Sequence, residues 1–135
     1  MKALTLTQPW ATLVITGRKK FETRSWYTGY RGPLAIHAAK GMPGWAKEAA
    51  REFGFDPTVL PRGVVLGTVH LAGVAPAQDV AAQLAWADDY LELAYGDYDA
   101  GRWAWQLVMP RECAPIAATG ALGMWEWAET PGEPT

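Results

Sequence analysis

One stretch of the sequence, residues 6–26, constrains the fold of this chain more than any other. Pro9 favours a helix start, because proline has no N–H to lose at the first helical position, and Gly17 favours a helix end. We therefore expect a short helix over 9–16, with Thr7 as its cap. Five charged residues fall within the next seven positions: Arg18, Lys19, Lys20, Glu22 and Arg24. The stretch predicts a short helix that leads directly into a charged strand.

The charged segment can be interpreted in two ways. If residues 20–26 are extended, Glu22, Arg24 and Trp26 share one face, while Lys19 lies at the junction with the helix. On a solvated surface, Glu22 would pair with a neighbouring base, which contributes at most about 1 kcal/mol. In a pocket, Lys19 and Arg24 would bind an anion or a carbonyl, and Glu22 would orient them or act as a base. The residues alone leave both interpretations open.

The rest of the chain alternates between short extended segments and short helical ones. Strands are expected at 3–7, 20–26, 33–38, 64–74, 102–108 and 121–128, and helices at 9–16, 45–53, 79–86 and 88–95. This pattern predicts an α+β chain, a small mixed β-barrel with short helices packed at its ends and edge. We expect one domain over residues 1–128 and a flexible, Pro-rich C-terminal tail over 129–135.

Three local features refine this expectation. The acidic segment 77–100 is expected to be an insertion between barrel strands, and Pro110 and Pro115 are expected to frame a connection that contains Cys113. Alternation within their strands predicts that Trp105 and Trp125 belong to the core. His37, in the middle of an apolar strand, is expected to be an interior histidine rather than a catalyst.

Charge is distributed unevenly along the chain. The formal net charge is −2, which argues against tight non-specific binding to nucleic acid. Residues 1–51 carry nine Lys and Arg against two acids, a balance of +7, whereas residues 52–135 carry three bases against twelve acids, a balance of −9. The first part could therefore form a basic face, or the two parts could interleave in space and cancel.

Composition excludes several classes of protein. A Ser-His-Asp triad would need Ser25, the only serine, and its surroundings do not resemble a nucleophile elbow. A zinc site has too few Cys and His candidates, so we expect no metal and no cofactor. Cys113 is the only cysteine, which favours a reducing compartment. No apolar stretch approaches the roughly 20 residues that span a bilayer. We expect a cytoplasmic protein without a membrane partner.

Several motifs together identify a family resemblance. They are Gln8-Pro9-Trp10, Gly17-x-Lys19-x-x-Glu22-x-Arg24 with Trp26 after it, and the segments 31–38, 103–107 and 120–125. With these motifs the chain resembles the ASCH domain family, relatives of the PUA-like RNA-binding domains, from about residue 2 to 128. The resemblance implies a small PUA-like barrel whose cleft holds the Lys, Glu and Arg of the second motif. It also implies a function related to RNA or nucleotides.

Our leading expectation is a module that binds RNA or a nucleotide, with aromatic rings that stack on bases and basic groups that contact phosphate or base edges. The candidate ligand-binding residues are Gln8, Trp10, Lys19, Glu22, Arg24, Trp26 and Trp103.

The alternative is a hydrolase that deacylates a modified cytidine or cleaves RNA, with Lys19 and Glu22 as catalytic residues. In the deacylating branch of the family, catalysis uses a Lys, a Thr three residues later and a distant Glu. Lys19 matches that lysine, but the position three residues later is Glu22, and Thr23 follows it. A third interpretation, a protein–protein adaptor, would use the acidic segment 77–100.

Overall fold

A six-stranded mixed sheet forms the body of the protein, for which a computed structural model describes residues 1–128. Its order is β2-β5-β4-β3-β1-β6, and β1 runs parallel to β3 while all other neighbours are antiparallel. The strands are β1 (Lys2–Leu6), β2 (Phe21–Arg24), β3 (Gly32–Ala38), β4 (Val64–Pro76), β5 (Trp103–Ala117) and β6 (Met124–Glu126). The helices are α1 (Trp10–Ile15), α2 (Gly44–Glu52), α3 (Ala77–Trp86) and α4 (Tyr90–Tyr95).

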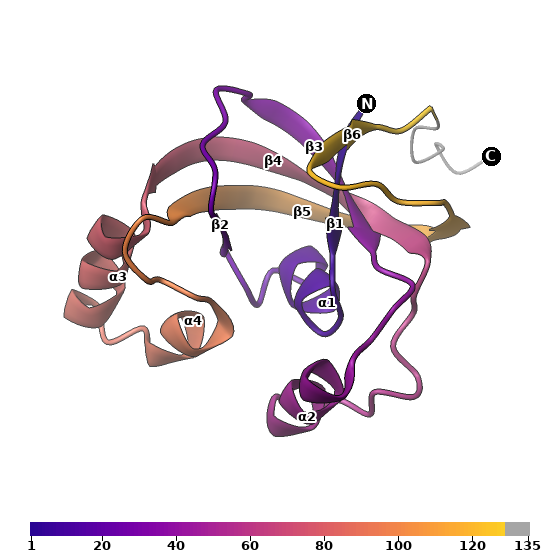
Figure 1. Ribbon diagram of the computed structural model, residues 1–135, viewed down its shortest axis with the longest axis horizontal. Helices are drawn as coiled ribbons and strands as arrows, with labels where there is room; N and C mark the ends of the chain where they lie inside the picture. The colour runs from indigo at the N-terminus through magenta and orange to yellow at the C-terminus, as the bar shows by residue number, and fades with distance from the viewer. Residues whose placement is uncertain (129–135) are drawn as a thin grey trace.

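The sheet curls into a half-barrel, and α1 lies on its concave side (Figure 1). Leu4 and Leu6 alternate along β1, as Leu34 and Ile36 do along β3, and these side chains form the main core with α1. The expected mixed α+β architecture with short helices is therefore confirmed, although the barrel stays open on one side. The tail predicted for 129–135 lies outside the described residues.

Strand β5 corrects one sequence-based expectation. It does not end before Pro110 but continues to Ala117, so the predicted connection around Cys113 is part of the strand. Both Pro110 and Pro115 fall where the register between β4 and β5 shifts. A bulge leaves a residue outside the ladder, so a proline there loses no ladder hydrogen bond.

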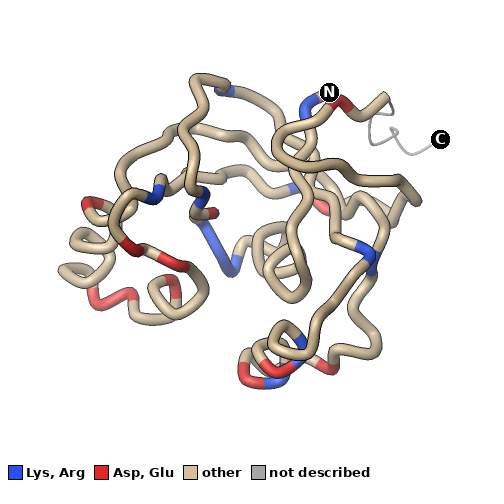
Figure 2. Tube along the Cα trace, in the orientation of Figure 1, with Lys and Arg blue, Asp and Glu red and all other residues tan. Residues whose placement is uncertain are grey.

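The acidic segment forms α3 and α4 between β4 and β5, as the sequence predicts. Phe21 of β2 packs against Val80, Leu84 and Ala104, which holds the segment beside the start of β2. Figure 2 shows its Asp and Glu positions near the basic connection between α1 and β2, so the basic and acidic parts of the chain meet. Within residues 1–128, no helix has the length and apolar character needed to cross a membrane.

Candidate functional site

The open side of the half-barrel lies between β2 and β1, and an arginine spans it. Arg24, the last residue of β2, donates from Nη2 to the backbone carbonyl of Thr5 in β1 at 3.0 Å. The parity of the strand places Glu22 on the same face as Arg24, and both line a cleft at this opening. The charged strand that the sequence predicts therefore lines a cleft.

Three of the expected site residues form a row of charges. Lys19 Nζ lies 3.7 Å from Glu22 Oε1, and Arg24 Nη2 lies 3.9 Å from Glu22 Oε2. Their side chains are only 1%, 13% and 25% exposed, in the order Lys19, Glu22, Arg24. Salt screens such partly buried pairs less than exposed ones. The arrangement fits the pocket interpretation of the charged segment better than the surface one.

The hydrogen bonds around this row show which atoms remain available. Lys19 Nζ donates to the carbonyl of Phe21, and Glu22 Oε1 accepts from the backbone N–H of Thr23 at 3.0 Å. Arg24 Nε, in contrast, is buried and has no partner among the described residues. An unsatisfied buried donor costs about 1–3 kcal/mol, and more when it is charged. An acceptor atom on a ligand in the cleft would remove that cost.

The cleft has a volume of about 530 Å³ and is built from four parts of the chain. Its lining residues are Thr5, Leu6, Thr7, Trp10, Glu22, Thr23, Arg24, Trp45, Ala94, Tyr95, Gly96, Asp97 and Arg102. They come from β1 and the segment that leads into the start of α1, from β2, from the start of α2, and from the end of α4 with the connection to β5. The volume is within the range of roughly 300–1,000 Å³ that small-molecule sites occupy.

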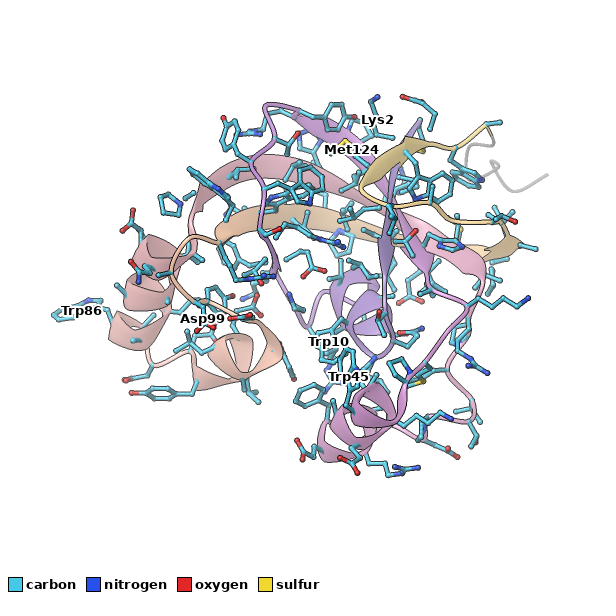
Figure 3. The ribbon with its side chains drawn as sticks, viewed as in Figure 1. Lys2, Trp10, Trp45, Trp86, Asp99 and Met124 are labelled. Atoms are coloured by element: carbon cyan, nitrogen blue, oxygen red, sulfur yellow. The ribbon has the colours of Figure 1, made fainter. Side chains whose placement is uncertain are left out.

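Two tryptophans form one wall of the cleft. The rings of Trp10 and Trp45 lie 5.7 Å apart between their centroids, and Figure 3 shows them together between α1 and α2. Trp10 is fixed, because its Nε1–H donates to the carbonyl of Tyr95 at 2.8 Å. Trp45 is 63% exposed. A planar ligand could therefore stack on Trp45 without displacing a core side chain.

The opposite wall was not anticipated from the sequence. Arg102 donates from Nη2 to the carbonyl of Thr23 at 2.9 Å, and its Nε lies 3.6 Å from Asp97 Oδ2. With Glu22 and Arg24, the cleft therefore carries two carboxylates and two guanidinium groups. Of the cleft residues that the sequence analysis did not identify, only Trp45 could have been recognised from the sequence. Ala46 and Ala50 form the buried side of α2, so a tryptophan at position 45 lies outside that side and is exposed.

Gln8 does not lie at the rim of the cleft, where it was expected. Its side chain is fully buried, and it donates to Thr12 Oγ1 at 2.9 Å and to the carbonyl of Pro61 at 2.8 Å. Its Oε1 accepts from the backbone N–H of Thr12 at 3.0 Å, so the side chain of Gln8, rather than that of Thr7, supplies an acceptor to the first turn of α1, whose N-cap position is Pro9. The expectation for Gln8 failed because a buried helix start requires an acceptor close to its first N–H groups.

Three other candidates also lie outside the cleft lining. Trp26 packs edge-on against Trp105 at 4.8 Å, and Trp103 packs edge-on against Tyr27 at 5.1 Å. Lys19 contacts Glu22 but lines a separate cavity of about 290 Å³ near Pro110. The structure thus brings Trp10, Glu22 and Arg24 to the cleft and leaves Trp26 and Trp103 against the core.

A buried glutamate in α4 anchors the strand that carries the site. Glu92 is only 2% exposed, and its Oε1 accepts from the backbone N–H groups of Lys20 and Phe21 at 2.8 and 2.7 Å. Burial raises the pKa of the Glu92 carboxyl above its ordinary value, although these two hydrogen bonds act in the opposite direction. The acidic segment therefore contributes to the position of β2.

No group of three or more His, Cys, Asp or Glu residues within 1–128 could hold a metal ion.

Comparisons with known proteins agree with the fold. The model of the ASCH domain matches residues 4–117. Activating signal cointegrator 1 is 40% identical to this chain over 77 residues in Homo sapiens and 35% identical over 77 residues in Mus musculus. These matches cover 50% of this chain but only 13% of each relative.

Solved structures are similar over a larger share of the chain. The crystal structure of ASCH from Zymomonas mobilis superposes with a TM-score of 0.56 at 14% identity, covering 86% of this chain and 72% of that one. A serine-to-alanine mutant of the same protein gives a TM-score of 0.56 at 16% identity, with the same coverage of 86% and 72%. At 14% and 16% sequence identity, the similarity to these structures shows a shared fold and nothing more specific.

Proposed function

Because the chain belongs to the ASCH domain family, we propose that its cleft binds a nucleobase of RNA or of a free nucleotide. The observation that carries the proposal is the buried, unpartnered Nε of Arg24, a residue whose side chain lines the cleft. A base edge presents ring nitrogens and carbonyl oxygens that accept such a hydrogen bond. Trp45 supplies a ring for stacking, which contributes about 1–3 kcal/mol per base.

The charges of the cleft favour a neutral base over a phosphate. Glu22 and Asp97 balance Arg24 and Arg102, so an anion in the cleft would meet as many carboxylates as guanidinium groups. Lys19 donates to a carbonyl and is almost completely buried, which leaves it poorly placed for phosphate. We therefore expect nucleoside affinity to depend little on salt, because phosphate contacts cause the strong salt dependence of nucleic-acid binding.

The test is a calorimetric titration of the protein with the four nucleosides and with short single-stranded RNA at low salt. Arg24→Lys keeps the charge but removes Nε, and it should weaken binding roughly 10- to 100-fold if that atom donates to the base. Arg111→Lys is the matched control, because Arg111 is exposed and does not line the cleft. Wild-type protein that binds neither nucleosides nor RNA would overturn the proposal, as would unchanged binding by a folded Arg24→Lys variant.

The buried contact between Lys19 and Glu22 favours a second candidate function, the hydrolysis of a modified cytidine amide or of RNA. In this mechanism Glu22, which reaches the cleft, accepts the proton of the attacking water, and Lys19 positions the carboxylate. Glu22→Gln separates the two functions. In a binding module affinity should stay within several-fold, whereas in a hydrolase turnover should fall roughly a hundredfold while binding persists. Both a binding titration and a product assay with acylated cytidine and short RNA are needed.

A further inference from the structure

A second and larger cavity lies beside the cleft. Its volume is about 900 Å³, and its lining includes His37, Lys40, Arg62 and the loop 117–122. Thr5 of β1 belongs to the lining of both spaces. Two of the family motifs, the segments 31–38 and 120–125, contribute residues to its lining, but the proposed function of the cleft does not use them.

We propose that this cavity binds the phosphate groups of a single-stranded RNA whose base occupies the cleft, an inference that rests on the proposed function. The first argument is charge. Lys40 and Arg62 line the cavity, and its lining contains no Asp or Glu. In the part of the chain that the structure describes, neither base forms an ion pair. The cavity therefore carries a net positive charge, whereas the charges of the cleft cancel. The cavity suits the phosphate of a nucleotide, and the cleft suits its base.

The two bases are brought together by the backbone. The segments that follow β3 and precede β4 run side by side, with a hydrogen bond from the N–H of Gly63 to the carbonyl of Ala38 at 2.8 Å. A Cβ at Gly63 would lie 3.9 Å from Lys40 Cβ, which shows how closely Lys40 approaches the residue after Arg62. Lys and Arg positions occur on both segments in Figure 2. The fold thus places the backbone positions of Lys40 and Arg62 close together at the surface of the cavity.

The loop that covers the cavity is held by His37. The ring accepts or donates at both nitrogens, with Nδ1 3.1 Å from Thr5 Oγ1 and Nε2 2.8 Å from the carbonyl of Ala118. A carbonyl can only accept, so Nε2 carries a proton and Nδ1 can accept from Thr5. The Nε1–H of Trp125 in turn donates to Thr5 Oγ1 at 3.0 Å. His37 is therefore the interior histidine that the sequence predicts, and it positions the loop instead of a ligand.

The same loop offers backbone donors to an anion. A Cβ at Gly120 would lie 2.6 Å from Thr5 Oγ1 and 2.8 Å from the His37 ring, so only glycine lets the loop approach β1 this closely. Within residues 1–128, the N–H groups of Gly120 and Ala121 donate no hydrogen bond. Free N–H groups beside two cations are a favourable setting for phosphate oxygens.

Thr5 lies between the two cavities, and β6 pairs with β1 only over residues 2–4. At Thr5 that edge of β1 is covered instead by Arg24 Nη2, which donates to the backbone carbonyl, and by the indole N–H of Trp125, which donates to Oγ1. A short RNA strand would cross β1 near Thr5, with its base toward Trp45 and its sugar-phosphate backbone toward Lys40 and Arg62. The alternative occupant is the single phosphate of a free nucleotide, and the test separates the two.

The experiment compares three probes, namely nucleosides, nucleoside 5′-monophosphates and single-stranded RNA tetranucleotides, over a range of salt concentrations. The double variant Lys40→Gln, Arg62→Gln keeps the first atoms of both side chains, and Arg111→Gln is the control for loss of an exposed base. Thermal melting checks that each variant is folded. If both bases contact phosphate, the double variant should bind the tetranucleotide roughly tenfold more weakly, and its salt slope should decrease by about 1.4, or 0.7 per contact. Its nucleoside affinity should equal that of the wild type.

Each other outcome contradicts a different part of the account. Tetranucleotides that bind no more tightly than nucleosides would overturn this inference and leave the proposed function intact, as would a double variant that behaves like Arg111→Gln. If nucleoside 5′-monophosphates bound as tightly as the tetranucleotides, and both more tightly than nucleosides, the cavity would be assigned to the phosphate of a free nucleotide. That result would overturn the proposal that an RNA strand occupies it. RNA binding that needs Lys40 and Arg62, without any nucleoside binding, would overturn the proposed function instead.

Discussion

Replacement of Glu92 tests whether the acidic segment holds the site strand in place. The carboxylate Oε1 accepts two backbone N–H groups, those of Lys20 and Phe21, immediately before the residues that reach the cleft. Glu92→Ala leaves both donors without this partner. Each unsatisfied donor costs about 1–3 kcal/mol, so for the two donors together we expect a loss of roughly 2–6 kcal/mol in the free energy of unfolding.

Glu92→Gln is the matched control. The amide oxygen of glutamine has two lone pairs and can accept both N–H groups as Oε1 does, without burial of a charge. At neutral pH we expect its free energy of unfolding to lie within about 1 kcal/mol of the wild type, because the weaker hydrogen bonds are offset by the smaller desolvation cost.

The same residue makes stability depend on pH in a defined direction. Burial raises the pKa of Glu92 in the folded state above its ordinary value of 4.5, so the folded protein binds this proton more tightly than the unfolded chain. Stability contributed by Glu92 is therefore fully present below pH 4.5 and is lost as pH rises through the raised pKa. Glu92→Gln has no carboxyl at this position and should lack this pH dependence. Its free energy of unfolding relative to that of the wild type should therefore increase as pH rises from 4.5 through the raised pKa of Glu92.

Urea unfolding followed by tryptophan fluorescence at several pH values measures all three quantities. The reasoning would be refuted if Glu92→Ala were as stable as the wild type, or if Glu92→Gln were as destabilised as Glu92→Ala. A relative stability of Glu92→Gln that does not change with pH would refute the pKa argument alone.

Three further changes address the core, the bulged strand and the cleft. Trp105→Ala removes a fully buried ring and should cost roughly 3–5 kcal/mol in urea unfolding; a loss below 1 kcal/mol would contradict the assigned core. Gly67→Ala should prevent stable folding, because its Cβ would approach the carbonyl oxygen of Arg111 to an impossible distance at a φ of +151°; a wild-type melting temperature would contradict the β4–β5 bulge. Trp45→Ala should lower nucleoside affinity by roughly 5- to 100-fold with little change in the melting temperature, since the ring is mostly exposed; unchanged affinity in the titration would remove stacking from the account.

The architecture was largely predictable because it depends on local patterns. The sequence shows alternating side chains along 3–7 and 33–38, which correspond to β1 and β3. It also shows the helix start signal of Pro9 and the helix end signal of Gly17, which correspond to α1. The length of β5 was not predictable, since Pro110 and Pro115 end a strand in most settings and are tolerated here only by bulges shared with β4. Bulges also break the alternation of faces along β4, so that Leu66 belongs to the same core cluster as Val69 and Leu71, whereas Val65 belongs to another.

The site was predictable only in part, for a related reason. Glu22 and Arg24 belong to one strand, so their common face follows from their spacing. Trp125, predicted to be core like Trp105, is only half-buried, because it lies in the short edge strand β6. Arg102 and Asp97 reach the cleft through a connection between distant segments, and no local pattern in one sequence specifies such a contact.

The most direct test of the account is a nuclear magnetic resonance titration of ¹⁵N-labelled protein with each of the four nucleosides at low salt. The cleft model predicts saturable shifts of the Trp45 indole N–H and the Arg24 Nε–H for at least one nucleoside. Trp86 is an internal control, because its ring is 91% exposed on α3 and projects away from the cleft (Figure 3). Saturable shifts at Trp45 and Arg24 with an unmoved Trp86 would support a base in the cleft. Shifts at neither residue, or equal shifts at Trp86 and Trp45, would contradict it.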